Sequence, residues 1–159
     1  MKSLYVWATV ALGLGFLLGG LFTFSQGWHT RGELIEDLLA ERLNVADPCT
    51  VLTYEGARAP EGVEIPKVDV DTAEEADCQA RVIRTHTLAL TDGKTYSELP
   101  RDDPGRELWF DSLTIQTPLH VAHVGLELTL FAMGVGVAFF GLGAYLLVIG
   151  VPLVRKIVS

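Results

Sequence analysis

Near the C-terminus, 27 consecutive residues from Leu128 to Val154 carry no charged side chain. As an α-helix this stretch would be about 40 Å long, which exceeds the roughly 30 Å hydrocarbon core of a bilayer. A second uncharged stretch, Leu4 to Phe24, has 21 residues, more than the roughly 7–15 apolar residues of a signal-peptide core. The sequence therefore predicts two membrane spans, the first being a retained anchor rather than a cleaved signal.

The residues between the two spans are strongly acidic. Residues 25–118 hold 9 Lys and Arg against 19 Asp and Glu, so they contribute −10 to the net charge of −8. Such a segment repels phosphate groups, which argues against nucleic acid as a partner. Lys2 precedes the first span, and Arg155 and Lys156 follow the second. Because cations beside membrane spans tend to stay in the cytoplasm, we expect both termini there and the acidic segment outside.

These observations predict an all-α membrane protein of the cytoplasmic (inner) membrane. Its fold would be a two-helix transmembrane hairpin with a small, mainly helical extracytoplasmic domain. We expect transmembrane helix 1 within residues 1–27, the acidic domain over 28–117, transmembrane helix 2 over 118–154 and a cytoplasmic tail over 155–159. Pro118 either begins the second membrane helix or kinks a longer, continuous one.

Helix start signals recur within the acidic domain. Thr30 with Glu33, and Thr72 with Glu75, have the three-residue spacing of a capping box. Asp103–Pro104 is typical of an N-cap followed by a proline at the first helical position. The sequence therefore predicts separate helices that begin near residues 30, 72 and 103.

Both cysteines of the chain, Cys49 and Cys78, lie in the acidic domain. An oxidising compartment would allow them to form a disulfide, which would stabilise a small domain by roughly 3–4 kcal/mol. Two buried thiols are the alternative. A two-cysteine metal site is disfavoured because the sequence has no CxxC spacing.

Three polar residues lie near the start of the second span. His120, His123 and Glu127 are spaced by three and four residues, so they share one helical face. Imidazole and carboxylate ligands suit zinc, copper or iron, and His29, beyond the first span, could add a ligand. Alternatively, the histidines lie in the membrane interface and Glu127 bonds a protein neighbour, because a carboxylate is costly near hydrocarbon.

Small residues recur along one face of the first span. Ala11, Gly15 and Gly19, with Ala8 and Thr23, follow one another at intervals of three and four residues. Small side chains allow two membrane helices to approach closely. We therefore expect Ala11, Gly15 and Gly19 to contact another helix, most simply the second span.

The second span has two faces of small residues. Gly136 and Gly143 share one face with Ala132 and Gly150. The face of His120 and Glu127 continues through a second set, formed by Gly134, Ala138 and Gly141. One face could contact the first span, so the other implies a neighbour outside this chain.

The segment ARVIRTHTLALTDGKTYSEL (residues 80–99), the DDPGR that follows it and the glycine-rich second span resemble a loosely defined group of actinobacterial two-span membrane proteins. His86-Thr87 and Gly93-Lys94-Thr95-Tyr96 carry most of this resemblance. It implies a short extracytoplasmic helical domain between two spans. Some members of the group carry an aromatic ring-opening dioxygenase label, for which this region of the chain offers no set of ligands.

Motifs of common enzymes are absent from the sequence: it has no P-loop, dinucleotide fingerprint, CxxCH haem site, HExxH or nucleophile elbow. We therefore expect a non-catalytic accessory subunit of a larger membrane complex, respiratory or otherwise energy-converting, without a cofactor. Its partners would be other membrane subunits and the lipid bilayer. The alternative is a metal-handling or redox-assisting membrane protein that uses the face of His120, His123 and Glu127.

Overall fold

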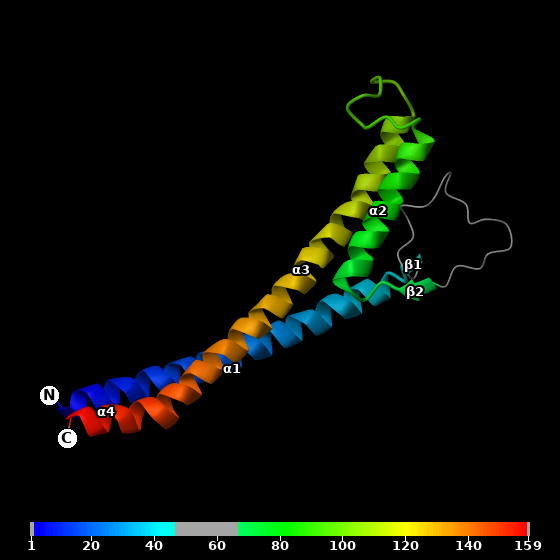
Figure 1. Cartoon of the computed structure of the whole chain (residues 1–159). Helices are drawn as coiled ribbons and strands as arrows, with labels where there is room; N and C mark the ends of the chain where they lie inside the picture. The colour runs from blue at the N-terminus through cyan, green and yellow to red at the C-terminus, as the bar shows by residue number, and fades with distance from the viewer. Residues whose placement is uncertain (1, 47–66, 159) are drawn as a thin grey trace. The chain divides into compact units, whose positions relative to one another are not determined.

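The computed structural model describes residues 2–46 and 67–158 (Figure 1). In chain order the described elements are α1 (Lys2–Ala40), β1 (Asn44–Ala46), β2 (Lys67–Asp69), α2 (Ala73–Leu90), α3 (Gly105–Tyr145), the π-helical turn η2 (Leu146–Gly150) and α4 (Val151–Val158). The chain divides into two compact units. Unit 1 is Met1–Gly32 with Leu128–Ser159, and unit 2 is Glu33–Glu127.

Two helical stretches are long and apolar enough to cross a membrane. They are Ser3–Ala40 and Gly105–Ile157, and the second consists of α3, η2 and α4. Of the most apolar part of each stretch, 11% is buried within the chain. A core helix of a water-soluble protein would bury most of that surface. The mostly helical structure and these two exposed apolar helices agree with the predicted fold class at this level.

Helix α1 runs without a break through the region where we predicted a new helix to begin. Gly27 and Gly32 are isolated glycines, and each costs only about 1 kcal/mol in a helix interior. Residues 2–40 contain no proline. The prediction of a helix start at Thr30 and Glu33 was therefore wrong, because inside a running helix the backbone N–H groups already have partners.

The other two helix starts are confirmed. The Thr72 side chain accepts from the backbone N–H of Glu75, and the Glu75 side chain accepts from the backbone of Thr72. Asp103 Oδ1 accepts from the N–H of Gly105 at 2.8 Å, at the first residue of α3. Pro118 lies inside α3. Of the two alternatives for Pro118, the structure therefore has the longer, continuous helix.

Unit 2 packs around side chains from α1, α2 and α3. Helix α2 lies antiparallel to α3. His123 of α3 contacts Ala73, the first residue of α2, whereas Trp109, earlier in α3, contacts Arg84, later in α2. Strands β1 and β2 pair antiparallel with Val45 opposite Val68, which adds a two-stranded sheet to the predicted helical domain. The core consists of Leu38, Val45, Val70, Ala76, Cys78, Ala80, Leu119, Ala122 and Leu126.

In unit 1, the N-terminal part of α1 packs antiparallel to the C-terminal part of α3 with η2 and α4, and the two chain ends lie at the same end of the unit (Figure 1). Residue numbers rise on one helix as they fall on the other: Gly27 lies at Thr129, Gly20 at Gly136, and Thr9 at Gly150. The apolar stretch that begins at Leu4 is therefore paired with the other helix from Thr9 to its end at Phe24.

Candidate functional site

The two helices of unit 1 touch through backbone atoms at three glycines. A Cβ atom added to Gly20 would lie 2.4 Å from the backbone N of Phe140, and one added to Gly136 would lie 2.8 Å from the carbonyl O of Gly20. A Cβ atom on Gly143 would lie 2.5 Å from the backbone N of Leu17. No side chain larger than hydrogen fits at these positions without moving a helix backbone.

The glycines at this contact are spaced by seven residues on both helices. They are Gly13, Gly20 and Gly27 on α1, and Gly136, Gly143 and Gly150 on α3 and η2. A seven-residue repeat keeps one side of each helix facing its partner when the pair coils slightly left-handed. Sequence reasoning missed Gly13, Gly20 and Gly27, because α1 also carries the competing series of Ala11, Gly15 and Gly19.

Contact between the second span and the face of Ala11, Gly15 and Gly19 was an incorrect expectation. Within the described residues, no atom lies within 4 Å of a Cβ built on Gly15 or Gly19, and Ala11 is exposed. Gly15 lies roughly 160° around the helix from Gly13, because the face that contacts α3 follows the seven-residue spacing of the glycines on α3. Gly136 and Gly143 do contact α1.

Of the three polar residues proposed to bind a metal, His123 has the most defined surroundings. Its Nδ1 lies 2.9 Å from the carbonyl O of Ala73, at the start of α2. Its Nε2 lies 4.0 Å from Glu127 Oε1, and the Glu127 side chain is 64% exposed. The Nδ1 that donates to this carbonyl cannot also bind a metal, which leaves Nε2 as the ring nitrogen that could. His123 therefore joins α2 to α3.

The other histidines proposed as ligands are His120 and His29. His120 is exposed on α3, and His29 belongs to unit 1. Across residues 2–46 and 67–158, no three His, Cys, Asp or Glu side chains form a group that could hold a metal ion. The metal hypothesis thus stays a prediction without a specific geometric observation in its favour.

Cys78 is buried in the core of unit 2, with 1% of its surface exposed. It is disulfide-bonded. Cys49, its predicted partner, lies outside the described residues, so the Cys49–Cys78 pairing stays a prediction. Burial explains why a bridge at Cys78 would hold the core residues of α2 in place.

Polar contacts join the loop between α2 and α3 to α3, and join α2 to α3. Trp109 Nε1 donates to the carbonyl O of Lys94 at 2.9 Å. The Arg106 guanidinium lies 3.9 Å from the centre of the Tyr96 ring and donates to the Tyr96 carbonyl O. Arg84 lies over the Trp109 ring at 5.6 Å. These cation–π contacts join residues that are not neighbours in the chain. No spacing in the sequence predicted them.

Two carboxylates of unit 2 have lowered pKa values, and both cap backbone N–H groups. Partial burial raises the pKa of Glu75, but hydrogen bonds from Thr72 and Asp71 outweigh it and lower the pKa overall. Hydrogen bonds from Thr95 lower the pKa of Glu98. A carboxylate that accepts N–H bonds is stabilised in its charged form. Both groups thus act in local folding.

Comparison of the chain with protein families, curated proteins and solved structures gives no match. The resemblance to actinobacterial two-span membrane proteins therefore stays a prediction.

Proposed function

We propose that this chain is a two-span membrane protein, a transmembrane hairpin that serves as a non-catalytic accessory subunit of a larger membrane complex. Unit 1 would be the membrane part. Its support is the pair of exposed apolar helices, which contact each other through glycines as membrane helices do. Unit 1 also contains no Asp or Glu. A charged side chain in hydrocarbon is costly.

The proposed orientation has both termini in the cytoplasm and unit 2 outside the cytoplasmic membrane. Lys2, Arg155 and Lys156 flank the apolar stretches at the end of unit 1 that holds the termini, in accord with the positive-inside rule. The disulfide-bonded Cys78 belongs to unit 2. Disulfides persist in oxidising compartments outside the cytoplasm, which supports the same orientation independently.

Glu127 precedes the membrane segment in this placement. Thr129 of α3 lies opposite Gly27 of α1. Gly27 is three residues past Phe24, where the apolar stretch of α1 ends. Nine residues, or about 13 Å of helix, separate Glu127 from Gly136. The 64% exposed carboxylate would therefore lie at the outer edge of the membrane, where water can solvate it.

The observation that carries the subunit proposal is a set of small residues that this chain leaves without a contact. The expected Cβ positions of Gly15 and Gly19 on α1, and of Gly134 and Gly141 on α3, have no atom within 4 Å among the described residues. In the same helices Gly20, Gly136 and Gly143 are packed against backbone. Close packing at small residues drives helix association in lipid, so the uncontacted set suits helices of other subunits.

Purification of the tagged chain from native membranes in mild detergent tests this proposal. We expect other membrane subunits to comigrate, and their identity decides whether the complex is respiratory or otherwise energy-converting. Gly15→Leu and Gly141→Leu should release these subunits, whereas Gly32→Leu, at another open position of α1, should not. A chain that elutes alone from native membranes would contradict the proposal.

A further inference from the structure

Helix α3 carries a regular series of exposed, uncharged residues within unit 2. They form what we call the α3 seam and are Phe110, Thr114, Thr117, Val121 and Val124. Their spacing alternates between four and three residues. Phe110 keeps 67% of its surface exposed and Val121 64%. Two residues along a helix correspond to a turn of about 200°, so Val121 lies on the side of α3 opposite the buried core residue Leu119.

The same spacing continues along the part of α3 that belongs to unit 1. The residues there are Leu128, Phe131, Val135, Ala138, Leu142 and Tyr145. From Phe110 to Tyr145 the interval is 35 residues, or five heptads, without a charged residue in the series. A repeat of this length is typical of a helix that packs along another helix in a left-handed coiled coil. It ends where the π-helical turn Leu146–Gly150 changes the phase of the helix.

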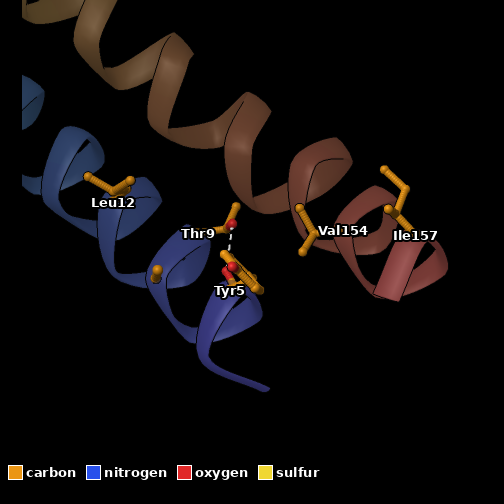
Figure 2. A pocket seen from close by; sticks show the side chains of 6 residues that line it. Tyr5, Thr9, Leu12, Val154 and Ile157 are labelled. Atoms are coloured by element: carbon orange, nitrogen blue, oxygen red, sulfur yellow. Dashed lines mark hydrogen bonds between the residues drawn. The ribbon is translucent and has the colours of Figure 1, made fainter. Parts of the chain in front are cut away.

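The two threonines do not make the α3 seam polar. The hydroxyl of Thr114 donates to the carbonyl O four residues earlier at 2.9 Å, and the hydroxyl of Thr117 does so at 2.7 Å. Figure 2 shows the same bond at Thr9, whose hydroxyl donates to the carbonyl O of Tyr5. Such hydroxyl hydrogens are satisfied within their own helix. A helix packed on the seam therefore needs no polar group to match them.

The lack of charge on the seam distinguishes between two kinds of partner. Unit 2 holds 8 Lys and Arg and 20 Asp and Glu, yet between Leu108 and Leu126 of α3 the only one of them is Asp111. A surface that binds a different subunit can carry charges that the subunit complements. A two-fold axis along the contact brings each residue against its own counterpart, so like charges would oppose each other. The uncharged seam therefore favours a second copy of this chain.

Charges at the start of α3 suit a parallel pair. The proposed membrane orientation gives all copies the same direction, so their α3 helices run parallel. In a parallel coiled coil with this register, Arg106 of one copy lies beside Glu107 and Asp111 of the other, because flanking and core positions of the two helices interlock. The Nη1 atom of Arg106 donates to the carbonyl O atoms of Tyr96 and Leu99, which fixes the guanidinium at this end of α3.

We propose that the α3 seam of unit 2 binds a second copy of this chain, parallel and in register. Phe110, Val121 and Val124 of one copy then pack against the same residues of the other. The inference rests on the proposed orientation in the membrane, which sets the direction of the pair. It goes beyond the proposed function because it assigns a partner to unit 2, whereas the uncontacted glycines concern unit 1.

Cysteine cross-linking of the full chain in native membranes tests the pairing. Thr114→Cys and Val121→Cys should each give a disulfide-linked dimer, in which mass spectrometry finds the substituted position joined to itself. An antiparallel pair would join at most one of these two positions to itself. Ile115→Cys is the control, because Ile115 is 47% exposed on the same helix but lies about 100° around it from Thr114. It should give no dimer.

A charged residue on the seam provides an independent measurement. Val121→Glu places two carboxylates opposite each other in the pair and should raise the dimer dissociation constant at least about tenfold. Ile115→Glu adds the same charge beside the seam and should leave the constant within about twofold. Since both side chains are exposed, neither change disturbs the core of unit 2. Sedimentation equilibrium in mild detergent measures the dissociation constants.

The outcomes separate this inference from the proposed function. Absence of dimers from both seam variants, or equal cross-linking of Ile115→Cys, would overturn the inference. A link from position 121 to a different protein would show that another subunit covers the seam and would overturn it too. Comigration of other subunits without a link from 121 to 121 would contradict the pairing alone. A linked dimer that elutes with no other subunit would support the pairing and contradict the accessory-subunit proposal.

Discussion

The two units hold their helices together in different ways. In unit 1 the contact consists of backbone against backbone at glycines such as Gly20 and Gly143. In unit 2 buried side chains such as Leu119 and Leu126 form a core, and hydrogen bonds and cation–π contacts fix the helix ends. Unit 1 has four Lys and Arg and no Asp or Glu, whereas unit 2 has 8 Lys and Arg and 20 Asp and Glu.

This difference is the one expected under the proposed placement of unit 1 in lipid and unit 2 in water. In water, burial of apolar side chains drives packing, so a core of large side chains forms and polar groups find partners. In lipid, apolar side chains gain nothing by leaving the solvent, so helices associate where small residues allow close dispersion contacts. Large apolar residues of unit 1, such as Phe22 and Phe131, are accordingly exposed. Substitutions that act on one type of packing only can test this comparison.

The largest effect is expected from a bulky residue at the glycine contact. Gly20→Leu places side-chain carbons where the Phe140 backbone lies. Overpacking usually costs about 1–3 kcal/mol, and a rigid backbone neighbour should raise the cost to about 3 kcal/mol or more. Thermal unfolding of the purified chain in detergent measures it. Gly15→Leu is the matched control, and equal midpoints for the two variants would contradict the assigned interface.

Removal of a core side chain should have the next largest effect, and in unit 2 only. Leu126 is fully buried, and Leu126→Ala should cost about 3 kcal/mol because it leaves a cavity. Leu113 lies on the same helix and is 43% exposed, so Leu113→Ala should cost clearly less. Hydrogen exchange of α2 amides measures both, and equal protection in the two variants would refute the assigned core.

Loss of the disulfide should destabilise unit 2 by about 3 kcal/mol. Cys78→Ser is the direct change, because Cys78 is bonded and buried in the core. If Cys49 is its partner, then Cys49→Ser should cost about the same, and the double variant should add little. Chemical unfolding with and without reductant gives the comparison. A wild-type protein that reductant leaves unchanged would contradict a structural disulfide.

Local signals in the sequence predicted much of this structure. The uncharged runs that begin at Leu4 and Leu128 became parts of the two apolar helices, and the caps at Thr72 and Asp103 formed as expected. Each of these signals depends on residues within one segment, so no knowledge of the packing is needed. The cap at Thr30 failed because the helix before it simply continued.

The choice between glycine faces was not predictable in the same way. Helix α1 carries one series of small residues with intervals of three or four and another, Gly13, Gly20 and Gly27, with intervals of seven. Either series would allow close approach, and the spacing on the partner helix decides which is used. The anchor of Trp109 on Lys94 likewise depends on how two distant segments fold together.

A smaller effect is expected at the cap of α2. Thr72→Ala removes the acceptor for the backbone N–H of Glu75, which should cost unit 2 about 1 kcal/mol. Thr85→Ala is a matched control, since the Thr85 hydroxyl donates to the Arg81 carbonyl within the middle of the same helix. Chemical unfolding should rank Thr72→Ala below Thr85→Ala in stability, and the reverse order would contradict the capping role.

The smallest effect is a pH dependence that comes from Glu75. Its pKa is lower in the folded protein than its ordinary value of 4.5, so its charged form stabilises unit 2 above that pH. This contribution is lost as the pH falls through the folded-state pKa. Because water screens the group, it should be below about 1 kcal/mol. Glu75→Gln should therefore differ from the wild type at pH 7 and converge with it in acid. Unfolding measured from pH 7 to pH 3 tests this, and a constant difference across that range would mean that the charge of Glu75 does not contribute.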